Sequence, residues 1–224
     1  MSAPVNPLTQ ACEDRDFVEW HRGCPWCAVW VLRVDKAQVQ ALVASVRDRL
    51  VTDLLPRYER QAHVTVAYRG LMAQGTNYPY AEYTPEHLLR DVERLQALQL
   101  PPFELQIQGV GSFSTVPYLA VVAEGALSHL HVAMRLHAAD PDWSYAPHVT
   151  VGHYGRRVPM ELMMERMQSG VAPGVLWQTK ISEIWLARYR TNDIAGPLYW
   201  EGRFDLHSNT YRAEAGALWT SSHC

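Results

Sequence analysis

The stretch His63-Val64-Thr65-Val66 decides the fold, because the same four residues return at His148-Val149-Thr150-Val151. Each copy alternates polar with β-branched residues, so an extended strand carries the histidine and the threonine on one face and both valines on the other. A small residue and a tyrosine follow each copy closely, at Ala67-Tyr68 and at Gly152-His153-Tyr154. The duplication predicts two similar halves whose strands meet across a shared groove, with one face for chemistry and the other for packing.

The composition is that of a globular protein. The chain has 224 residues, of which 48% are hydrophobic and 19% charged, and its net charge is −3. It therefore lacks the general positive field that would let it coat long duplex DNA, and a nucleic-acid partner should be short or held locally. No apolar run approaches the roughly 20 residues that span a bilayer, and Met1 to Arg15 lacks the apolar core of a signal peptide. We expect a cytoplasmic monomer with no membrane partner.

The four cysteines, Cys12, Cys24, Cys27 and Cys224, are too few and too unevenly spaced for a disulfide framework. Cys24 and Cys27 have the spacing of a redox dithiol, but they precede an apolar run, whereas in thioredoxin-like proteins the pair follows a strand and opens a helix. A zinc site made of Cys12, His21, Cys24 and Cys27 is an alternative, since thiolates and imidazole are ligands that zinc prefers. The other interpretation is a pair of small buried thiols at the start of a strand.

The hydrophobic pattern predicts alternating strands and helices. Strands are expected at 28–34, 63–68, 103–110, 118–123, 175–189 and 198–204, with another starting at His148, and helices at 35–50, 84–98, 126–137 and 158–168. No strand is the continuous apolar block that a fully covered parallel sheet requires. The pattern therefore favours an α+β fold with antiparallel sheets, each covered by helices on one face. We expect an extension at 1–26, one domain at 27–204 and a tail at 205–224.

The two histidines are candidates for acid and base catalysis. Histidine titrates near neutral pH, so a pair in one groove can hold one neutral and one protonated ring, as phosphoester cleavage needs. The threonine two residues along each strand lies on the same face, where its hydroxyl can donate to a phosphate oxygen. A zinc hydrolase would instead use His63, His148 and a third ligand such as His153 or a carboxylate. A single copy of the motif would more often be a half-buried, hydrogen-bonded histidine in an ordinary strand.

The doubled motif, the segment QGVGSFSTVPYLAVV between its copies and the run APHVTV at 146–151 resemble the 2H phosphoesterase superfamily, in its bacterial RNA 2′,5′-ligase and 2′,3′-cyclic phosphodiesterase-like branch. The resemblance covers roughly 27–204. It implies a bilobal, pseudo-twofold α+β fold with a central groove, His63 and His148 as acid and base, and Thr65 and Thr150 gripping the phosphate. It implies no metal or other cofactor. The substrates that it implies carry 2′,3′-cyclic phosphates, 2′,5′-linkages or related oligonucleotide ends.

Aromatic and basic residues near the motifs are candidates for substrate binding. Aromatic faces stack on bases, and arginines bind flanking phosphates. The candidates are Tyr68, Tyr154, Phe113 and Trp30 for stacking, and Arg69, Arg156 and Arg157 for phosphate. The alternative is that the aromatic residues belong to the core and the arginines to solvated turns. The leading hypothesis is a metal-independent phosphodiesterase acting on an RNA end, an oligonucleotide or a cyclic nucleotide, and the second is a binding module that recognises the same ligands without turnover.

Overall fold

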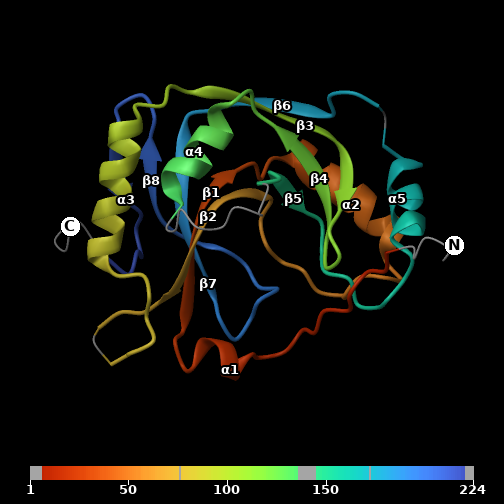
Figure 1. The fold of residues 1–224 in the computed structure, drawn as a ribbon, viewed down its shortest axis with the longest axis horizontal. Helices are drawn as coiled ribbons and strands as arrows, with labels where there is room; N and C mark the ends of the chain where they lie inside the picture. Colours follow the sequence, from red (N-terminus) through yellow and green to blue (C-terminus); the bar gives the residue numbers. More distant parts are fainter. Residues whose placement is uncertain (1–6, 76, 136–144, 172, 220–224) are drawn as a thin grey trace, which may run out of the picture.

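The computed structural model describes residues 7–75, 77–135, 145–171 and 173–219. Its strands are β1 (Trp26–Arg33), β2 (His63–Met72), β3 (Phe103–Ser112), β4 (Pro117–Val122), β5 (His148–Thr150), β6 (Trp177–Ile181), β7 (Glu183–Arg190), β8 (Tyr199–Asp205) and β9 (Thr210–Ala213). The helices are α1 (Val18–His21), α2 (Ala37–Leu50), α3 (Pro85–Leu98), α4 (Ala126–Met134) and α5 (Met160–Gln168). The strands form one nine-stranded sheet in the order β6-β3-β4-β5-β2-β1-β7-β8-β9 (Figure 1).

A strand-helix-strand unit occurs twice and places the two motifs side by side. The first unit is β1-α2-β2 and the second is β4-α4-β5, and each ends on a motif strand. The two motif strands, β2 and β5, are antiparallel neighbours in the middle of the sheet. An antiparallel pair has a twofold axis between its strands, so the halves are related by a local pseudo-twofold. The predicted α+β fold with antiparallel pairing is confirmed, and the pairing of β2 with β5 joins both halves into one sheet.

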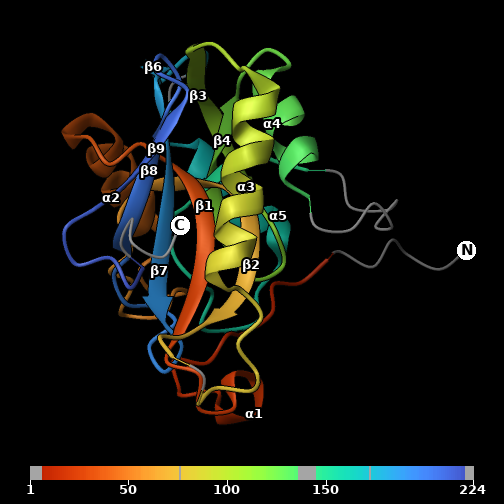
Figure 2. The same ribbon diagram turned by 90° about the vertical axis from the view of Figure 1, so that its left-hand side faces the viewer.

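Helices from both halves pack together over the apolar face of the sheet. α3 packs against α4, and α2 packs against α5. Figure 1 shows these two pairs on opposite sides of the molecule, and Figure 2 shows α3 and α4 next to each other. Val64 and Val149 are fully buried in the main core together with residues of all four helices. The opposite face of β1 and β7 carries a smaller cluster that includes Val29, Val31 and Trp185.

The segment 175–189, which the sequence predicts as one strand, is two strands that pair with different halves. β6 pairs with β3 in the second half, whereas β7 pairs with β1 in the first. Ser182 alone separates them, and its carbonyl accepts a hydrogen bond from the Leu206 N–H at 2.9 Å, next to the end of β8. The sheet therefore curls until its β6 edge approaches β8. The break reflects which neighbouring strand each segment pairs with, and such pairing cannot be read from the sequence of the segment itself.

The segments that flank the expected domain also contact it. Residues 205–219 differ from the expected tail, because β9 pairs with β8 and Trp219 is buried in the main core. In the extension, Thr9 is buried and exchanges hydrogen bonds with Val158, while residues 1–6 lie outside the described ranges. The last two residues of the expected helix 126–137 and the end of the tail, 220–224, also lie outside them. Among the helices of the described ranges, none combines the length and the apolarity needed to cross a bilayer.

Candidate active site

The pairing of the two motifs brings both histidines and both threonines together. Val64 lies opposite Val149 in the antiparallel register, so His63 faces Thr150 and Thr65 faces His148 one step to either side. Because the valines point into the core, these four side chains lie on the other face of the sheet. The two histidines are diagonal neighbours, a relation in which residues lie about 7–8 Å apart. A group the size of a phosphate fits between such rings.

Each imidazole is held in the same orientation by a backbone carbonyl. The Nδ1–H of His63 donates to the Gln61 carbonyl at 2.8 Å, and the Nδ1–H of His148 donates to the Ala146 carbonyl at 2.8 Å. A carbonyl oxygen only accepts, so each neutral ring carries its proton on Nδ1 and leaves Nε2 with a lone pair. Both Nε2 atoms are thus available for proton transfer.

Burial makes both rings weak bases. It lowers the pKa of His63 from 6.5 to about 4, an effect to which the nearby Arg60 and His148 add and which the Gln61 carbonyl opposes. Burial also lowers the pKa of His148, and the Ala146 carbonyl opposes this shift. His63 is 8% exposed, and His148 is only partly buried. The two environments therefore differ, and His148 is the ring more open to a ligand.

Two aromatic side chains lie against His148. The ring of Phe113 is 5.0 Å from the His148 ring, and the ring of Tyr118 is 5.3 Å from it. Phe113, which the sequence analysis named, is 36% exposed. The sequence analysis missed Tyr118. This residue of β4 lies opposite Thr150 of β5, and only the pairing of the strands places it beside His148. Together they form an aromatic wall beside the second motif.

Tyr68 lies farther along the same face of β2. It pairs with Val29 of β1, as Thr65 pairs with Val31, and both valines belong to the smaller cluster on this face. Its side chain is 50% exposed. Partial burial raises the pKa of its hydroxyl group. Tyr68 is therefore placed where a ligand that extends from the histidines could reach it.

The remaining predicted substrate-binding residues do not join this cluster. Tyr154 is fully buried and its hydroxyl is hydrogen-bonded to Ser112 at 2.8 Å, so its ring cannot stack on a base. Arg69 is 3% exposed and paired with Asp91 on the helix-covered side, and Arg156 pairs with Asp53 at 3.4 Å. Trp30 is also fully buried. The interpretation of Tyr154 and Trp30 as core residues is the correct one, and the phosphate role expected for Arg69 is wrong because a carboxylate already occupies its guanidinium.

Other polar residues near the histidines were missed by the sequence analysis. The Arg60 guanidinium lies 3.9 Å from the centre of the Tyr189 ring, and its charge lowers the pKa of both His63 and His153. Tyr58 interacts with the Thr150 hydroxyl, and its ring packs against His153. Within the described residues, Arg60 Nε and His153 Nδ1 are buried without a hydrogen-bond partner. In the sequence, only the position of Arg60 three residues before the first motif could have indicated that it lies near the histidines.

The cysteines do not gather as the alternative zinc site would require. Cys12 donates to the Thr115 carbonyl and Cys24 to the Met72 carbonyl, while His21 is hydrogen-bonded to Asp16 at 2.6 Å. Cys24 and Cys27 are buried free thiols, and Cys224 lies outside the described residues. In the described part of the chain, no three His, Cys, Asp or Glu side chains are grouped so that they could hold a metal ion. The alternative of two buried thiols fits the structure.

Solved structures of other proteins are similar to this chain. TT0787 of Thermus thermophilus is 16% identical and superposes with a TM-score of 0.53 over 80% of this chain and 97% of that one, which shows a shared fold. Escherichia coli LigT complexed with phosphate is 17% identical, with a TM-score of 0.46 over 79% and 93% of the two chains. LigT complexed with 3′-AMP is 17% identical, with a TM-score of 0.44 over 74% and 98%.

The family is shown by sequence. No curated protein sequence matches the chain significantly. The sequence model of the 2′-5′ RNA ligase superfamily matches residues 25–193, which include both motifs and most of the sheet. The expected resemblance to the two-histidine phosphoesterases is therefore confirmed, and the chain belongs to the 2′-5′ RNA ligase superfamily.

Proposed function

We propose that this protein is a metal-independent phosphodiesterase that acts on RNA ends bearing a 2′,3′-cyclic phosphate or on 2′,5′-linked oligonucleotides. The observation that carries the proposal is the register of β2 against β5, which sets two imidazoles and two hydroxyls on one face. Each imidazole keeps Nε2 for proton transfer because Nδ1 is bonded to a carbonyl. Family membership supports phosphoester chemistry, and the geometry supports acid and base roles for the histidines.

The difference between the two imidazoles suggests a role for each. His63 is the more buried ring and lies near Arg60, so it stays neutral and acts as the base. It takes a proton from a water molecule as the water oxygen bonds to phosphorus. His148 is the more open ring, so a bound phosphate anion can stabilise its protonated form, which then donates a proton to the departing ribose oxygen. One P–O bond forms, one breaks, and the cyclic diester becomes a monoester and a free hydroxyl.

The threonines and the aromatic wall complete the proposed site. The hydroxyls of Thr65 and Thr150 donate to the non-bridging oxygens, where negative charge gathers as water attacks. Phe113 and Tyr118 border His148, so the base of the terminal nucleotide can pack on them. In this arrangement the reacting phosphate lies between the motif residues of β2 and β5, and its nucleoside lies against Phe113 and Tyr118.

Incubation with a panel of substrates tests the proposed activity. The panel contains 2′,3′-cyclic mononucleotides, oligonucleotides with a 2′,3′-cyclic end and 2′,5′-linked dinucleotides, and products are separated by chromatography. We expect conversion of at least one class to a phosphomonoester, at the same rate with and without EDTA, because one imidazole accepts the proton of the attacking water and the other imidazole protonates the leaving oxygen. Loss of turnover in EDTA that added zinc restores would favour a zinc hydrolase. Tight binding without any product would favour a binding module.

The pH profile of kcat/KM tests the assignment of base and acid. His63 must be neutral, so activity falls as the pH drops through its pKa of about 4. His148 must be protonated, so activity falls as the pH rises through its pKa, which burial places below 6.5. The free enzyme should therefore show a maximum of kcat/KM between about pH 4 and 6.5, with about a tenfold fall per pH unit above the upper pKa. A maximum above pH 7 would contradict the assignment.

A further inference from the structure

The face of the sheet that carries the two motifs continues beyond His63 onto β1 and β7. Arg33 of β1 is the direct partner of His63 in the antiparallel register, as Val31 is of Thr65. Directly opposite residues of such a pair lie on the same face, with Cβ atoms about 4.5–5.5 Å apart. Val31 in turn lies opposite Trp185 of β7. Arg33 and Trp185 therefore share a face with the first motif, on the side of β2 away from β5.

The end of this face next to His63 is accessible to a ligand. The helices α2, α3, α4 and α5 pack on the opposite face, with the main core. On the motif face, Trp20 of α1 packs against the smaller cluster and against the cluster that contains Leu71, at the end of β2 farthest from His63. α1 therefore covers the far end of this face, and Arg33 is exposed.

The Arg33 guanidinium is held over two indole rings. Its carbon atom lies 4.9 Å from the centre of the Trp200 ring of β8 and 5.5 Å from the centre of the Trp185 ring. Both distances fall within the roughly 6 Å over which a cation is attracted to an aromatic face. The two indoles also contact each other edge to face, with ring centres 5.3 Å apart. Arg33 is therefore oriented by packing against aromatic rings.

Arg33 differs from the neighbouring arginine in that its charge is available to a ligand. In the part of the chain that the structure describes, Arg33 forms no ion pair. Arg203 also lies over the Trp185 ring, at 5.5 Å, but it pairs with Glu183 at 3.5 Å and with Glu214 at 3.4 Å. A ligand on this face therefore meets the Arg33 guanidinium already oriented and not neutralised.

We infer that Arg33, held over Trp185 and Trp200, binds the base of a second nucleoside of the substrate. Bases stack on the planes of arginine guanidinium groups as well as on aromatic rings. Arg33 lies on the strand next to His63, and adjacent strands are about 4.8 Å apart. A nucleoside whose base stacks on Arg33 can therefore be attached to the phosphate at the histidines.

The inference rests on the proposed function and specifies its substrate. Phe113 and Tyr118 border His148. Arg33 borders His63, so groups that can bind a base lie on both sides of the reacting phosphate. A 2′,5′-linked dinucleotide has a nucleoside on each side of its phosphate, and a cyclic mononucleotide has one nucleoside only. The dinucleotide therefore makes a contact that the cyclic mononucleotide lacks.

A comparison of two substrates tests this inference. We would measure kcat/KM for adenosine 2′,3′-cyclic phosphate and for 2′,5′-linked adenylyl-adenosine. In R33A, the ratio of kcat/KM for the dinucleotide to that for the cyclic phosphate should fall about tenfold, an effect within the range that stacking of one base contributes. R33K keeps the charge and should recover part of the ratio.

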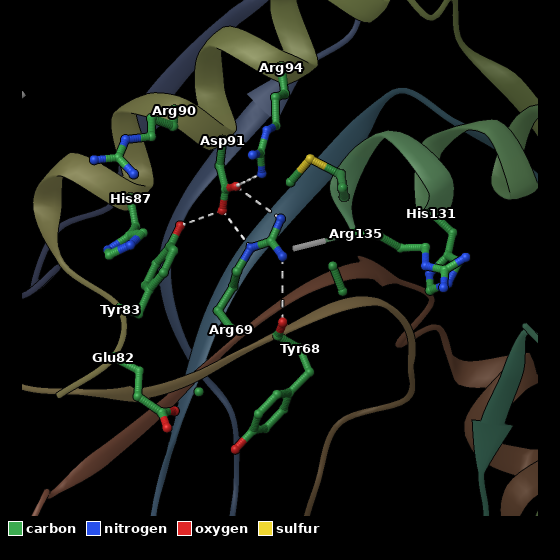
Figure 3. A pocket seen from close by; sticks show the side chains of 13 residues that line it. Tyr68, Arg69, Glu82, Tyr83, His87, Arg90, Asp91, Arg94, His131 and Arg135 are labelled. Atoms are coloured by element: carbon green, nitrogen blue, oxygen red, sulfur yellow. Dashed lines mark hydrogen bonds and ion pairs between the residues drawn. The ribbon is translucent and has the colours of Figure 1, made fainter. Parts of the chain in front are cut away.

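The control is an arginine on the other face of the sheet. Figure 3 shows Arg90 and Arg94 projecting from α3 at a pocket of about 750 Å³, which residues of α4 also line. Arg90 is exposed, as Arg33 is, but α3 packs on the opposite face, so R90A should leave the substrate ratio unchanged. R33A should unfold at nearly the wild-type temperature, because the Arg33 side chain is exposed.

An unchanged ratio in R33A, or an equal fall in R90A, would overturn the inference while the proposed function stands. If the wild type cleaves the cyclic phosphate but not the dinucleotide, the inference also fails. If it cleaves the dinucleotide alone, about tenfold lower kcat/KM in R33A but not in R90A supports the inference, and equal values in R33A and the wild type overturn it.

If the wild type cleaves neither substrate, the proposed function fails, and isothermal titration calorimetry with the dinucleotide tests the site alone. About tenfold weaker binding by R33A than by the wild type and R90A would support a base-binding role for Arg33. Equal binding by all three proteins, or no binding by the wild type, would overturn it.

Discussion

Replacing either His63 or His148 by alanine is expected to lower kcat by about 10³-fold on whichever substrate the wild type cleaves, since each ring transfers one proton in the same displacement. The effect on folding should be small for His148, which is partly buried, and larger for His63, which is 8% exposed. Single-turnover rates with substrate in excess of the dissociation constant would separate this loss from weaker binding. Circular dichroism would show that each variant is folded.

The control for both variants is H129A. His129 is exposed on α4 and its removal should change kcat less than twofold. The double variant H63A/H148A should be little slower than either single variant, because the two rings act in one step and their effects do not add. A histidine variant that retains more than a tenth of the wild-type kcat would rule out the acid and base roles proposed for the pair.

Replacing Asp91 by alanine is expected to reduce the free energy of unfolding by about 3–5 kcal/mol, which would be the largest stability effect of a single substitution proposed for this chain. The Asp91 carboxylate accepts hydrogen bonds from Arg69, Trp30 and Tyr83. Its removal leaves a buried guanidinium without its counter-charge and two buried donors without an acceptor. Urea denaturation at pH 7 measures the change.

Two further variants test the cause of the expected loss of stability in D91A. D48A removes an exposed carboxylate from α2 and should change stability by less than about 0.5 kcal/mol. R69M/D91L replaces the buried ion pair by apolar groups and should be more stable than D91A, because no buried charge is left unpaired. If D91A were as stable as the wild type, the hydrogen-bond network around Asp91 would not stabilise the fold.

Much of the fold could be predicted from local sequence. The alternation in HVTV and the helical spacing of apolar residues in 35–50 and 84–98 correspond to β2, α2 and α3. Thr84 and Pro85 mark the start of α3, where Thr84 is extended and Pro85 is the first helical residue. These features depend on residues close in the chain, so a single sequence is enough to predict them.

The surroundings of the site could not be predicted in the same way. Tyr118 and Arg60 carry no motif, and they are recognised only because strand pairing and the curl of the sheet bring them near His148 and His63. Arg69 and Tyr154 follow the motifs closely, yet both are buried by partners that are distant in sequence. The break at Ser182 likewise depends on contacts with β3 and β1.

The sequence by itself determined that each motif carries a histidine and a threonine on one face and two valines on the other, because side-chain direction alternates along any strand. Only the tertiary structure decided that Val64 meets Val149, since register depends on contacts between chain segments far apart in sequence. A shift by one residue would turn one motif's histidine toward the core and separate the pair. The chemistry proposed for this protein therefore depends on the register between its two halves.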